Sequence, residues 1–358
     1  MNKVNASLPL SASPRRGERR GEGRGEGAAK ALWLLSLLVI LSCLLLGLGI
    51  TVGSTGFDSV ANIQRDPQAM LIVWEIRLPR TLGAWLAGAL LGLSGAVAQG
   101  LFRNPLADPY LLGSASGASL GVALAMALFG VSPLATQWVA RVGLTGAAFL
   151  SAIAAVLLTL LLAKGVQHTL RLLLAGVVVG VVLGAITSLI LLLTPDIMQA
   201  MQAFMLGTTA FVGWAACAIM ATAFGVSLVA AWLMSHVLDG LALGEATAQS
   251  LGLQLPQMRA ALVAVLALTA GTAVAQTGLI AFVGLAAPHL VRSMVKTTHG
   301  RLIVLSSLMG AVLLTAADVL ARLLMAPQEL PVGVLTAVLG GGYLLWLMRR
   351  QPGRGAGL

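Results

Sequence analysis

The sequence predicts an all-α polytopic membrane protein, and its composition and its apolar runs carry that prediction. Of its 358 residues, 58% are hydrophobic and only 9% are charged, whereas an average soluble domain contains about 25% charged residues. So few charges cannot cover the surface of a 36.6 kDa globule. A water-soluble enzyme, a disordered chain and a disulfide-rich secreted domain are therefore excluded. The mean hydropathy of +0.95 supports the same conclusion.

Ten apolar runs follow one another along the chain, and each has the length of a membrane span. They cover residues 31–53, 70–100, 110–130, 137–163, 170–194, 211–235, 258–277, 279–297, 302–325 and 332–348. Only the break at Thr277-Gly278 separates the seventh run from the eighth. Segment 197–210 is too short to cross the bilayer, so we expect it to lie at the membrane surface. Small residues such as Gly88 and Gly92 within the runs favour closely packed helices.

The basic residues indicate which side of the membrane is cytoplasmic. Ten spans place both ends of the chain on one side, and 17 Lys and Arg fall on that side: Lys3, Arg15, Arg16, Arg19, Arg20, Arg24, Lys30, Arg103, Lys164, Arg171, Arg259, Arg292, Lys296, Arg301, Arg349, Arg350 and Arg354. Five fall on the other side: Arg65, Arg77, Arg80, Arg141 and Arg322. Because basic residues gather in cytoplasmic loops, both termini are expected in the cytoplasm.

The two ends of the chain lie outside the apolar runs. Residues 1–30 hold seven basic residues and three Glu but no apolar run, so we expect a disordered basic cytoplasmic tail. Its simplest role is a topology anchor, with nucleic-acid or lipid binding as the alternative. A cleaved signal peptide is disfavoured because the first apolar run has span length. Residues 31–350 form the ten-helix domain, and 351–358 form a second cytoplasmic tail.

Residues that could bind a metal or perform catalysis form no recognisable pattern. Cys43 and Cys217 lie inside apolar runs, the four His form no HExxH, and no G-x-x-x-x-G-K-[ST] loop occurs. We therefore expect no metal, no cofactor and no ATP hydrolysis in this chain. A membrane enzyme is disfavoured for the same reason.

Ionisable residues within the spans are nearly absent. Asp318 and Arg322 are four apart on one helix face and can form an ion pair. No pair of buried carboxylates and no relay of buried Lys or His accompanies them. A proton-coupled secondary transporter normally needs such groups, so this class is disfavoured and the energy for transport is expected to come from elsewhere.

A short repeat suggests that the two halves of the chain are related by inverted symmetry. Ala96–Gln99 recurs as Ala273–Gln276. The first copy lies in a span that runs inward and the second in a span that runs outward, as an inverted repeat requires. Chance is the alternative explanation, because the match is four common residues long.

Three polar segments between the spans have unusual patterns. Residues 103–109 form a cytoplasmic loop that two prolines keep out of helix. Residues 239–252 are expected to form a short cytoplasmic helix that Gly252 ends, docked either on a partner or on its own bundle. Residues 75–80 place basic groups on the outer side, which indicates either an acidic partner or snorkelling at the interface.

Several motifs closely resemble the permease subunits of ATP-binding-cassette (ABC) importers for iron-siderophores, haem and vitamin B12, the FecCD and BtuC-like permeases. The motifs are Arg77–Thr81, Leu93–Ala96, Gln99–Pro109, Arg171–Gly176, Leu251–Gly252, Gly278–Arg292, Ala317–Arg322 and Glu329–Gly333. They occur in order over residues 31–350 and leave the N-terminal tail outside.

The resemblance implies an assembly in the bacterial inner membrane. It implies a homodimer of ten-helix subunits with the translocation path at the dimer axis. Two separate cytoplasmic ATPase subunits would bind ATP and Mg, and a periplasmic binding protein would deliver the substrate, so no nucleic-acid partner is needed. Haem is the favoured cargo, with a ferric siderophore or cobalamin as alternatives within the family and a secondary transporter as the alternative class.

The resemblance also implies roles for individual residues. The coupling helix, at about 241–251, would contact the ATPase through Leu241, Gly244, Glu245, Thr247, Ser250, Leu251 and Gly252. Acidic side chains of the binding protein would dock on Arg77, Arg80 and Arg322; for Arg322 this role competes with the ion pair to Asp318, and both can hold. The cytoplasmic gate would contain Asn104, Pro105, Leu106, Thr169 and Leu170, where Leu170 departs from the family's small polar residues. Met198, Met201 and Met205, near the outer mouth, are expected to pack rather than to touch substrate.

Overall fold

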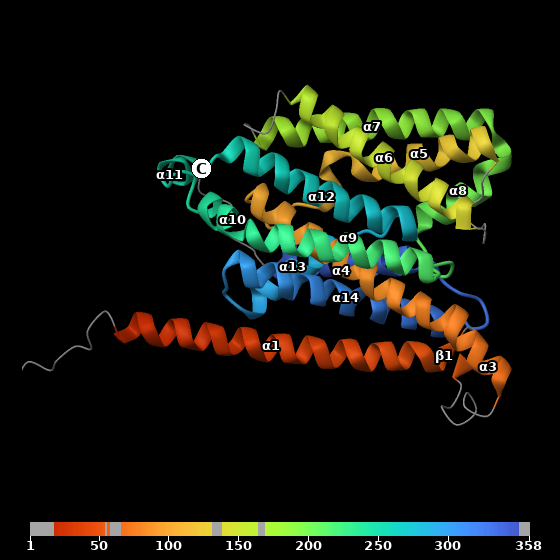
Figure 1. Cartoon of the computed structure of the whole chain (residues 1–358), viewed down its shortest axis with the longest axis horizontal. Helices are drawn as coiled ribbons and strands as arrows, with labels where there is room; N and C mark the ends of the chain where they lie inside the picture. The colour runs from red at the N-terminus through yellow and green to blue at the C-terminus, as the bar shows by residue number, and fades with distance from the viewer. Residues whose placement is uncertain (1–17, 54–55, 58–65, 131–137, 164–168, 351–358) are drawn as a thin grey trace, which may run out of the picture.

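The computed structural model describes residues 18–53, 56–57, 66–130, 138–163 and 169–350. The long helices lie side by side along one axis and form an elongated bundle (Figure 1). We call the end that carries α3 and α8 the outer end and the end that carries α10 and α11 the inner end, following the topology expected from the sequence. The tail residues 1–17 and 351–358 fall outside the described residues.

Seven helical segments in the described part of the chain are long and apolar enough to cross a membrane. They are α1 (Glu18–Thr51), the continuous run of α3 (Pro67–Ile72), η1 (Val73–Arg77) and α4 (Leu78–Leu101), then α6 (Trp138–Leu162), α7 (Thr169–Leu193), α9 (Trp214–Leu233), α12 (Leu255–Thr277) and α14 (His299–Leu323). Three shorter helices complete the set: α5 (Ser114–Phe129), α13 (Val283–Met294) and α15 (Val332–Arg350). These ten helical segments correspond one to one with the ten predicted spans.

Boundaries between spans follow local backbone chemistry. The predicted break after the seventh span is confirmed, because Gly278 ends α12 with φ +70°, a conformation that favours glycine. Within the second span, η1 is a π-helical turn just before Pro79. Pro79 has no N–H to donate to the carbonyl of Glu75, so the regular hydrogen-bond ladder is interrupted there.

The first helix begins earlier than the sequence predicts. α1 starts at Glu18, inside the segment expected to be a disordered tail. Extending an existing helix avoids the cost of nucleation, and the segment contains the helix formers Glu, Arg and Ala beside four glycines, which disfavour helix. At its other end, α1 leads into a two-stranded antiparallel ribbon of β1 (Val52–Gly53) and β2 (Gly56–Phe57).

The centre of the bundle is the pair α4 and α14. α4 is buried along nearly its whole length, and glycines bring the two backbones into contact. A Cβ atom on Gly88 would lie 2.3 Å from the carbonyl oxygen of Gly310, and one on Gly92 would lie 2.1 Å from that of Ser306. Small residues that let helices approach this closely are typical of membrane bundles. The two helices therefore form one tightly joined unit.

The two copies of the predicted repeat lie on neighbouring helices. Ala96–Gln99 belongs to α4 and Ala273–Gln276 to α12, and these helices pack together and run in opposite directions (Figure 1). Their glutamines make different contacts. Gln99 donates to the carbonyl oxygen of Leu285 at 3.1 Å, whereas Gln276 donates to Thr145 at 2.8 Å.

Short elements close the two ends of the bundle. At the outer end, η3 (Pro195–Ile197) and α8 (Met198–Leu206) occupy the segment predicted to lie at the membrane surface. At the inner end, η2 (Pro109–Leu112) follows the 103–109 loop, and α10 (Ser235–Ala242) and α11 (Glu245–Ser250) connect α9 to α12. The single short helix predicted for 241–251 is thus wrong. Gly244, with φ +108°, divides this segment into two helices.

Candidate functional site

A cluster of charged side chains lies at the outer end. Arg80 of α4 reaches Asp318 of α14 at 3.2 Å through Nη2, and its Nη1 lies 2.8 Å from a carboxylate oxygen of Glu329. Asp318 also pairs with Arg322 on the next turn of α14 and accepts a hydrogen bond from Thr209. The predicted Asp318–Arg322 ion pair is therefore confirmed. It is part of a larger network, which we call the outer cluster: Arg80, Thr209, Asp318, Arg322 and Glu329.

Arg322 anchors the end of α1 to the bundle. Its Nη1 donates to the carbonyl oxygens of Gly49 at 2.9 Å and Val52 at 3.2 Å, and its Nη2 donates to the hydroxyl of Thr81 at 3.1 Å. The residue is 1% exposed. Burying a guanidinium is costly unless carboxylates and carbonyls satisfy it. Both Nη atoms of Arg322 find such partners within the chain, whereas its buried Nε has none among the described residues. Arg322 is thus engaged within the chain, and the docking role expected for it stays a prediction.

The other two predicted docking residues lie closer to the surface. Arg77 and Arg80 are 9% and 7% exposed. Arg77 donates to the carbonyl oxygens of Ile50 at 3.4 Å and Thr51 at 3.5 Å. The accessible member of the outer cluster is Glu329, whose side chain is 26% exposed. The cluster is thus open to solvent mainly through this carboxylate.

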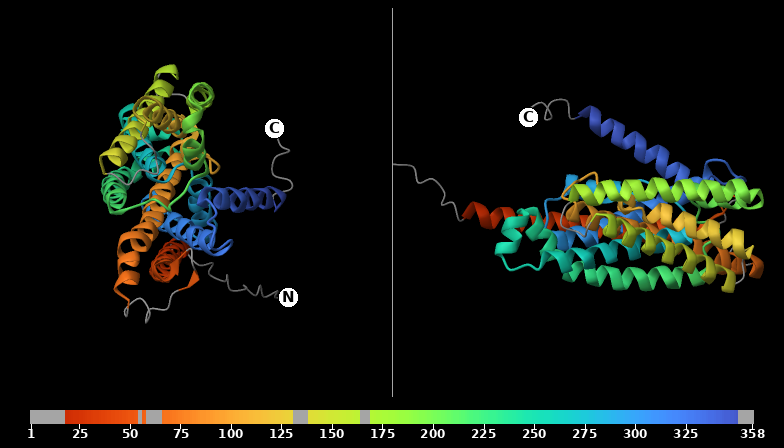
Figure 2. Two further views of the ribbon diagram at one scale, coloured as in Figure 1. Left: turned by 90° about the vertical axis from the view of Figure 1, so that its right-hand side faces the viewer. Right: turned by 90° about the horizontal axis from the view of Figure 1, so that it is seen from above.

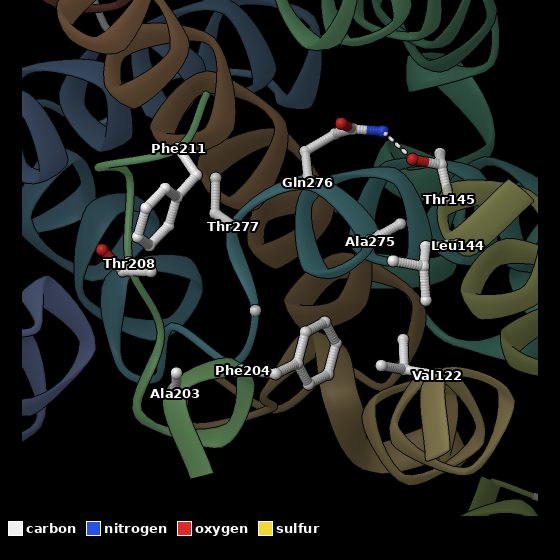
Figure 3. A pocket seen from close by; sticks show the side chains of 11 residues that line it. Val122, Leu144, Thr145, Ala203, Phe204, Thr208, Phe211, Ala275, Gln276 and Thr277 are labelled. Carbon is white, nitrogen blue, oxygen red and sulfur yellow. Dashed lines mark hydrogen bonds between the residues drawn. The ribbon is translucent and has the colours of Figure 1, made fainter. Parts of the chain in front are cut away.

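A small cavity is lined by residues of α5, α6, α8 and the end of α12 (Figure 3). Its volume is about 70 Å³. The rings of Phe204 and Phe211 and the Gln276–Thr145 hydrogen bond line it (Figure 3). Met201 of α8 is fully buried beside it, which confirms that this methionine packs. Met198 and Met205 are exposed.

The coupling segment at the inner end is tied to the bundle by charge. Glu245 lies 2.6 Å from Arg259 of α12 and 3.5 Å from Arg103 of the 103–109 loop. Glu245 was expected to contact the ATPase, but its carboxylate is engaged within the chain. Leu241 is fully buried in the core, and the contact role expected for it stays a prediction. A leucine at this position holds α10 on the bundle.

The remaining coupling residues are accessible. Thr247, Ser250, Leu251 and Gly252 are exposed, Gly244 is half-buried, and Leu251 is 64% exposed. Gly252, with φ +82°, ends α11 as predicted. Its N–H donates to the carbonyl of Gln249 at 2.9 Å, and the N–H of Leu253 donates to that of Ala248 at 3.2 Å. This pair of bonds is the Schellman motif.

The predicted gate loop has a defined shape. The side chain of Asn104 accepts a hydrogen bond from the N–H of Leu106 at 2.9 Å, which fixes a tight turn at Pro105. All three residues are exposed at the inner end. Asp108 accepts from the N–H of Tyr110 at 2.8 Å. Burial raises the pKa of the Asp108 carboxyl above its ordinary value, and this hydrogen bond opposes the shift.

The second half of the predicted gate lies outside what can be described. α7 begins at Thr169, but the side chains of Thr169 and Leu170 are not among the described ones. Their relation to the Asn104 turn stays a prediction. Among the described residues, no three side chains of the metal-ligating types lie together.

Sequence analysis did not identify the partners of the inner-end residues. Glu245 and Arg259 are far enough apart that no helical spacing links them, and Asp239 pairs with His299 from another span. The sequence contains no local pattern from which either pair could have been predicted. The residues of the outer cluster were easier to identify from the sequence, because Arg80, Asp318 and Glu329 are rare charged residues near the ends of predicted spans.

This chain is similar to permease proteins of bacterial transport systems. The model of the FecCD transport family matches residues 34–350. The chain is 38% identical over 325 residues to the hemin transport system permease protein HmuU of Yersinia pestis, covering 89% of this chain and 95% of that protein. It is 40% identical over 284 residues to the vitamin B12 import system permease protein BtuC of Salmonella paratyphi A, covering 78% and 84%.

Solved structures show the same likeness. An inward-facing metal-chelate type ABC transporter superposes with a TM-score of 0.77 and 29% sequence identity, covering 89% of this chain and 98% of that chain. PsaBC from Streptococcus pneumoniae superposes with a TM-score of 0.55 at 18% identity, which shows the fold alone.

Proposed function

Since this chain belongs to the FecCD transport family and is the membrane-spanning permease subunit of an ABC importer, we propose that it carries an iron complex, with haem as the favoured cargo, from the periplasm to the cytoplasm. The chain is a transporter subunit and not an enzyme, because ATP hydrolysis belongs to a separate subunit in such importers. A secondary transporter is set aside for the same reason.

Haem is favoured by one observation. The similarity to a hemin permease extends over 95% of that protein, whereas the similarity to a vitamin B12 permease covers 84% of it at a comparable identity. Cobalamin is therefore the second candidate. Both are large metal complexes with an extensive apolar surface, and a path poor in charged groups suits either one.

The cargo can be identified on the partner binding protein. We expect the purified binding protein to bind haem and to show a Soret band, and to release that haem into liposomes that contain this chain and its ATPase only when ATP is enclosed. Cobalamin and a ferric siderophore serve as competitors in the same assay. A binding protein that takes up cobalamin and leaves haem free would overturn the haem assignment while leaving the importer class intact.

The proposed assembly is a homodimer with two ATPase subunits and one periplasmic binding protein. ATP binding would draw the ATPase subunits together, and the two permease subunits would rock between inward-open and outward-open states. The exposed residues of the coupling segment, Thr247, Ser250 and Leu251, are the proposed ATPase contacts. Both chain termini are proposed to lie in the cytoplasm, in accord with the distribution of basic residues.

The outer cluster is the proposed docking point for the binding protein. Arg77 and Arg80 would receive acidic side chains, and the partly exposed Glu329 already holds Arg80 in the same way. A docking carboxylate would therefore replace Glu329 on Arg80, with little net change in charge at the site.

A further inference from the structure

The first residue of α14 is capped by a side chain from a different helix. Oδ1 of Asp239, on α10, lies 3.0 Å from the backbone nitrogen of His299 and 2.7 Å from its ring Nδ1. The first N–H groups of a helix have no partner within it, and Thr298, which precedes α14, makes no capping bond with its side chain. The carboxylate of Asp239 supplies this bond and a favourable charge at the positive end of the helix.

The ring of His299 also fixes α10 against α4. A Cβ atom on Gly100, in the last turn of α4, would lie 3.1 Å from Cδ2 of His299 and 3.2 Å from Leu238 of α10. A Cβ atom on the next residue of α14, Gly300, would lie 3.2 Å from the hydroxyl oxygen of Ser235 on α10. Three elements, α4, α10 and α14, thus meet at His299.

α11 packs on α10, in addition to its ion pairs with Arg259 and Arg103. A Cβ atom on Gly240 would lie 2.7 Å from the side chain of Leu253 and 3.7 Å from that of Ala248. These are the two residues that the Schellman motif at the end of α11 brings together. A force on the exposed face of α11 is therefore passed to α10 through this packing.

Beyond His299, α14 is a 25-residue helix that runs to the outer cluster (Figure 1). It is joined to α4 by backbone contact at Gly88 and Gly92, and it ends at Asp318 and Arg322. A helix held this tightly moves as a unit. The Asp239–His299 contact links the coupling segment to the α14 side of that unit, and the Glu245–Arg103 pair links it to the loop that follows α4.

We propose that Asp239 is a positioning residue that transmits movement of the coupling segment to the α4–α14 unit. The inference rests on the proposed function, in that the ATPase is taken to act on α11. The link works through hydrogen-bond acceptance by Oδ1, so an amide at this position preserves it and a methyl group does not.

The test uses the complete importer in liposomes, with the binding protein outside and ATP inside. We expect Asp239→Ala to lower haem imported per ATP hydrolysed by about fivefold, the low end of typical coupling between sites, while basal ATP hydrolysis persists. Asp239→Asn should keep most of the coupling because Asn retains the acceptor. His236→Gln is the matched control, since His236 lies on the same helix, is exposed, and has its ring Nδ1 within 2.9 Å of the carbonyl oxygen of Leu233, in its own chain segment.

A double-mutant cycle separates a link from two independent structural roles. Asp239→Ala with His299→Ala should be no worse than the more severe single variant, because both changes break the same contact. Additive losses, or unchanged import per ATP in Asp239→Ala, would overturn the proposal. Stimulation of ATP hydrolysis by the binding protein gives the same comparison for any cargo. A wild-type complex that imports no haem therefore counts against the haem assignment alone.

Discussion

Asp318 decides the energetics of the outer cluster, because it lies between two buried guanidinium groups. It is fully buried, and it contacts both Arg80 and Arg322. The ion pair alone is weak support for stability, since desolvation offsets the attraction. Removing the carboxylate is expected to destabilise the fold, because the two cations then remain buried side by side.

We expect Asp318→Asn to lower the free energy of unfolding by about 3–5 kcal/mol, the usual cost of breaking a buried ion pair. The measurement is the denaturation midpoint of the purified chain in detergent. Asp196→Asn, at an exposed carboxylate in η3, is the control and should leave the midpoint unchanged. Equal midpoints for both variants would show that the cluster does not hold the outer end together.

Glu329 is the residue through which docking can be tested without disturbing the core. If Arg80 receives a carboxylate from the binding protein, Glu329 competes for the same Nη1. We expect Glu329→Gln to tighten the complex with the binding protein, measured as a lower Kd. Glu75→Gln, at an exposed carboxylate on the same side, should not change the Kd. Unchanged or weaker binding by Glu329→Gln would contradict the docking role of Arg80.

At the scale of elements, the contact between α4 and α14 depends on residues without side chains. A methyl group on Gly92 would overlap the carbonyl oxygen of Ser306, and neither backbone can withdraw without opening the centre of the bundle. The same chemical change at Gly184 of α7 meets no atom within 4 Å. Comparing alanine substitutions at Gly92 and Gly184 therefore separates the effect of packing from the effect of helix propensity.

We expect Gly92→Ala to destabilise the chain by about 1–3 kcal/mol through overpacking. Gly184→Ala should be neutral or stabilising by up to about 1 kcal/mol, because Ala is the better helix former. The denaturation midpoints of the two variants, compared under the same detergent conditions, measure these changes in stability. A similar response from both would show that the close approach of α4 and α14 contributes little.

At the scale of the whole molecule, one helix stands apart from the bundle. Figure 2 shows α15 projecting away from the other long helices. Its outward face carries Val338, Leu339 and Leu345, which are 67%, 55% and 65% exposed. A second copy of the chain is the partner that the homodimer hypothesis assigns to this face.

We expect the purified chain to have twice its mass of 36.6 kDa when the detergent contribution is subtracted. Val338→Trp should shift it toward the monomer, because the larger ring cannot fit in a packed interface. Val226→Trp on α9, which is similarly exposed at 64%, should remain dimeric. Light scattering coupled to size exclusion gives the mass, and a dimeric Val338→Trp variant would exclude α15 as the interface.

Much of the fold was predictable because membrane spans are a local property of the sequence. Each span needs about 20 apolar residues, and each break needs a residue such as Gly278 whose conformation few others adopt. The division of the coupling segment at Gly244 was missed, because a glycine in a polar helical pattern gives no sign of its φ angle. The family motifs located the outer charges without showing that Arg322 is buried.

The sequence by itself determined the all-α membrane fold, the ten spans and the family, since apolar length and contiguous motifs are read along the chain. Only the tertiary structure decided which charges meet: Arg80 with Asp318, Glu245 with Arg259, and Asp239 with His299. These partners lie 14 to 238 residues apart. Their pairing follows from how distant helices pack, and burial then determines whether a side chain faces a partner protein or stabilises its own bundle.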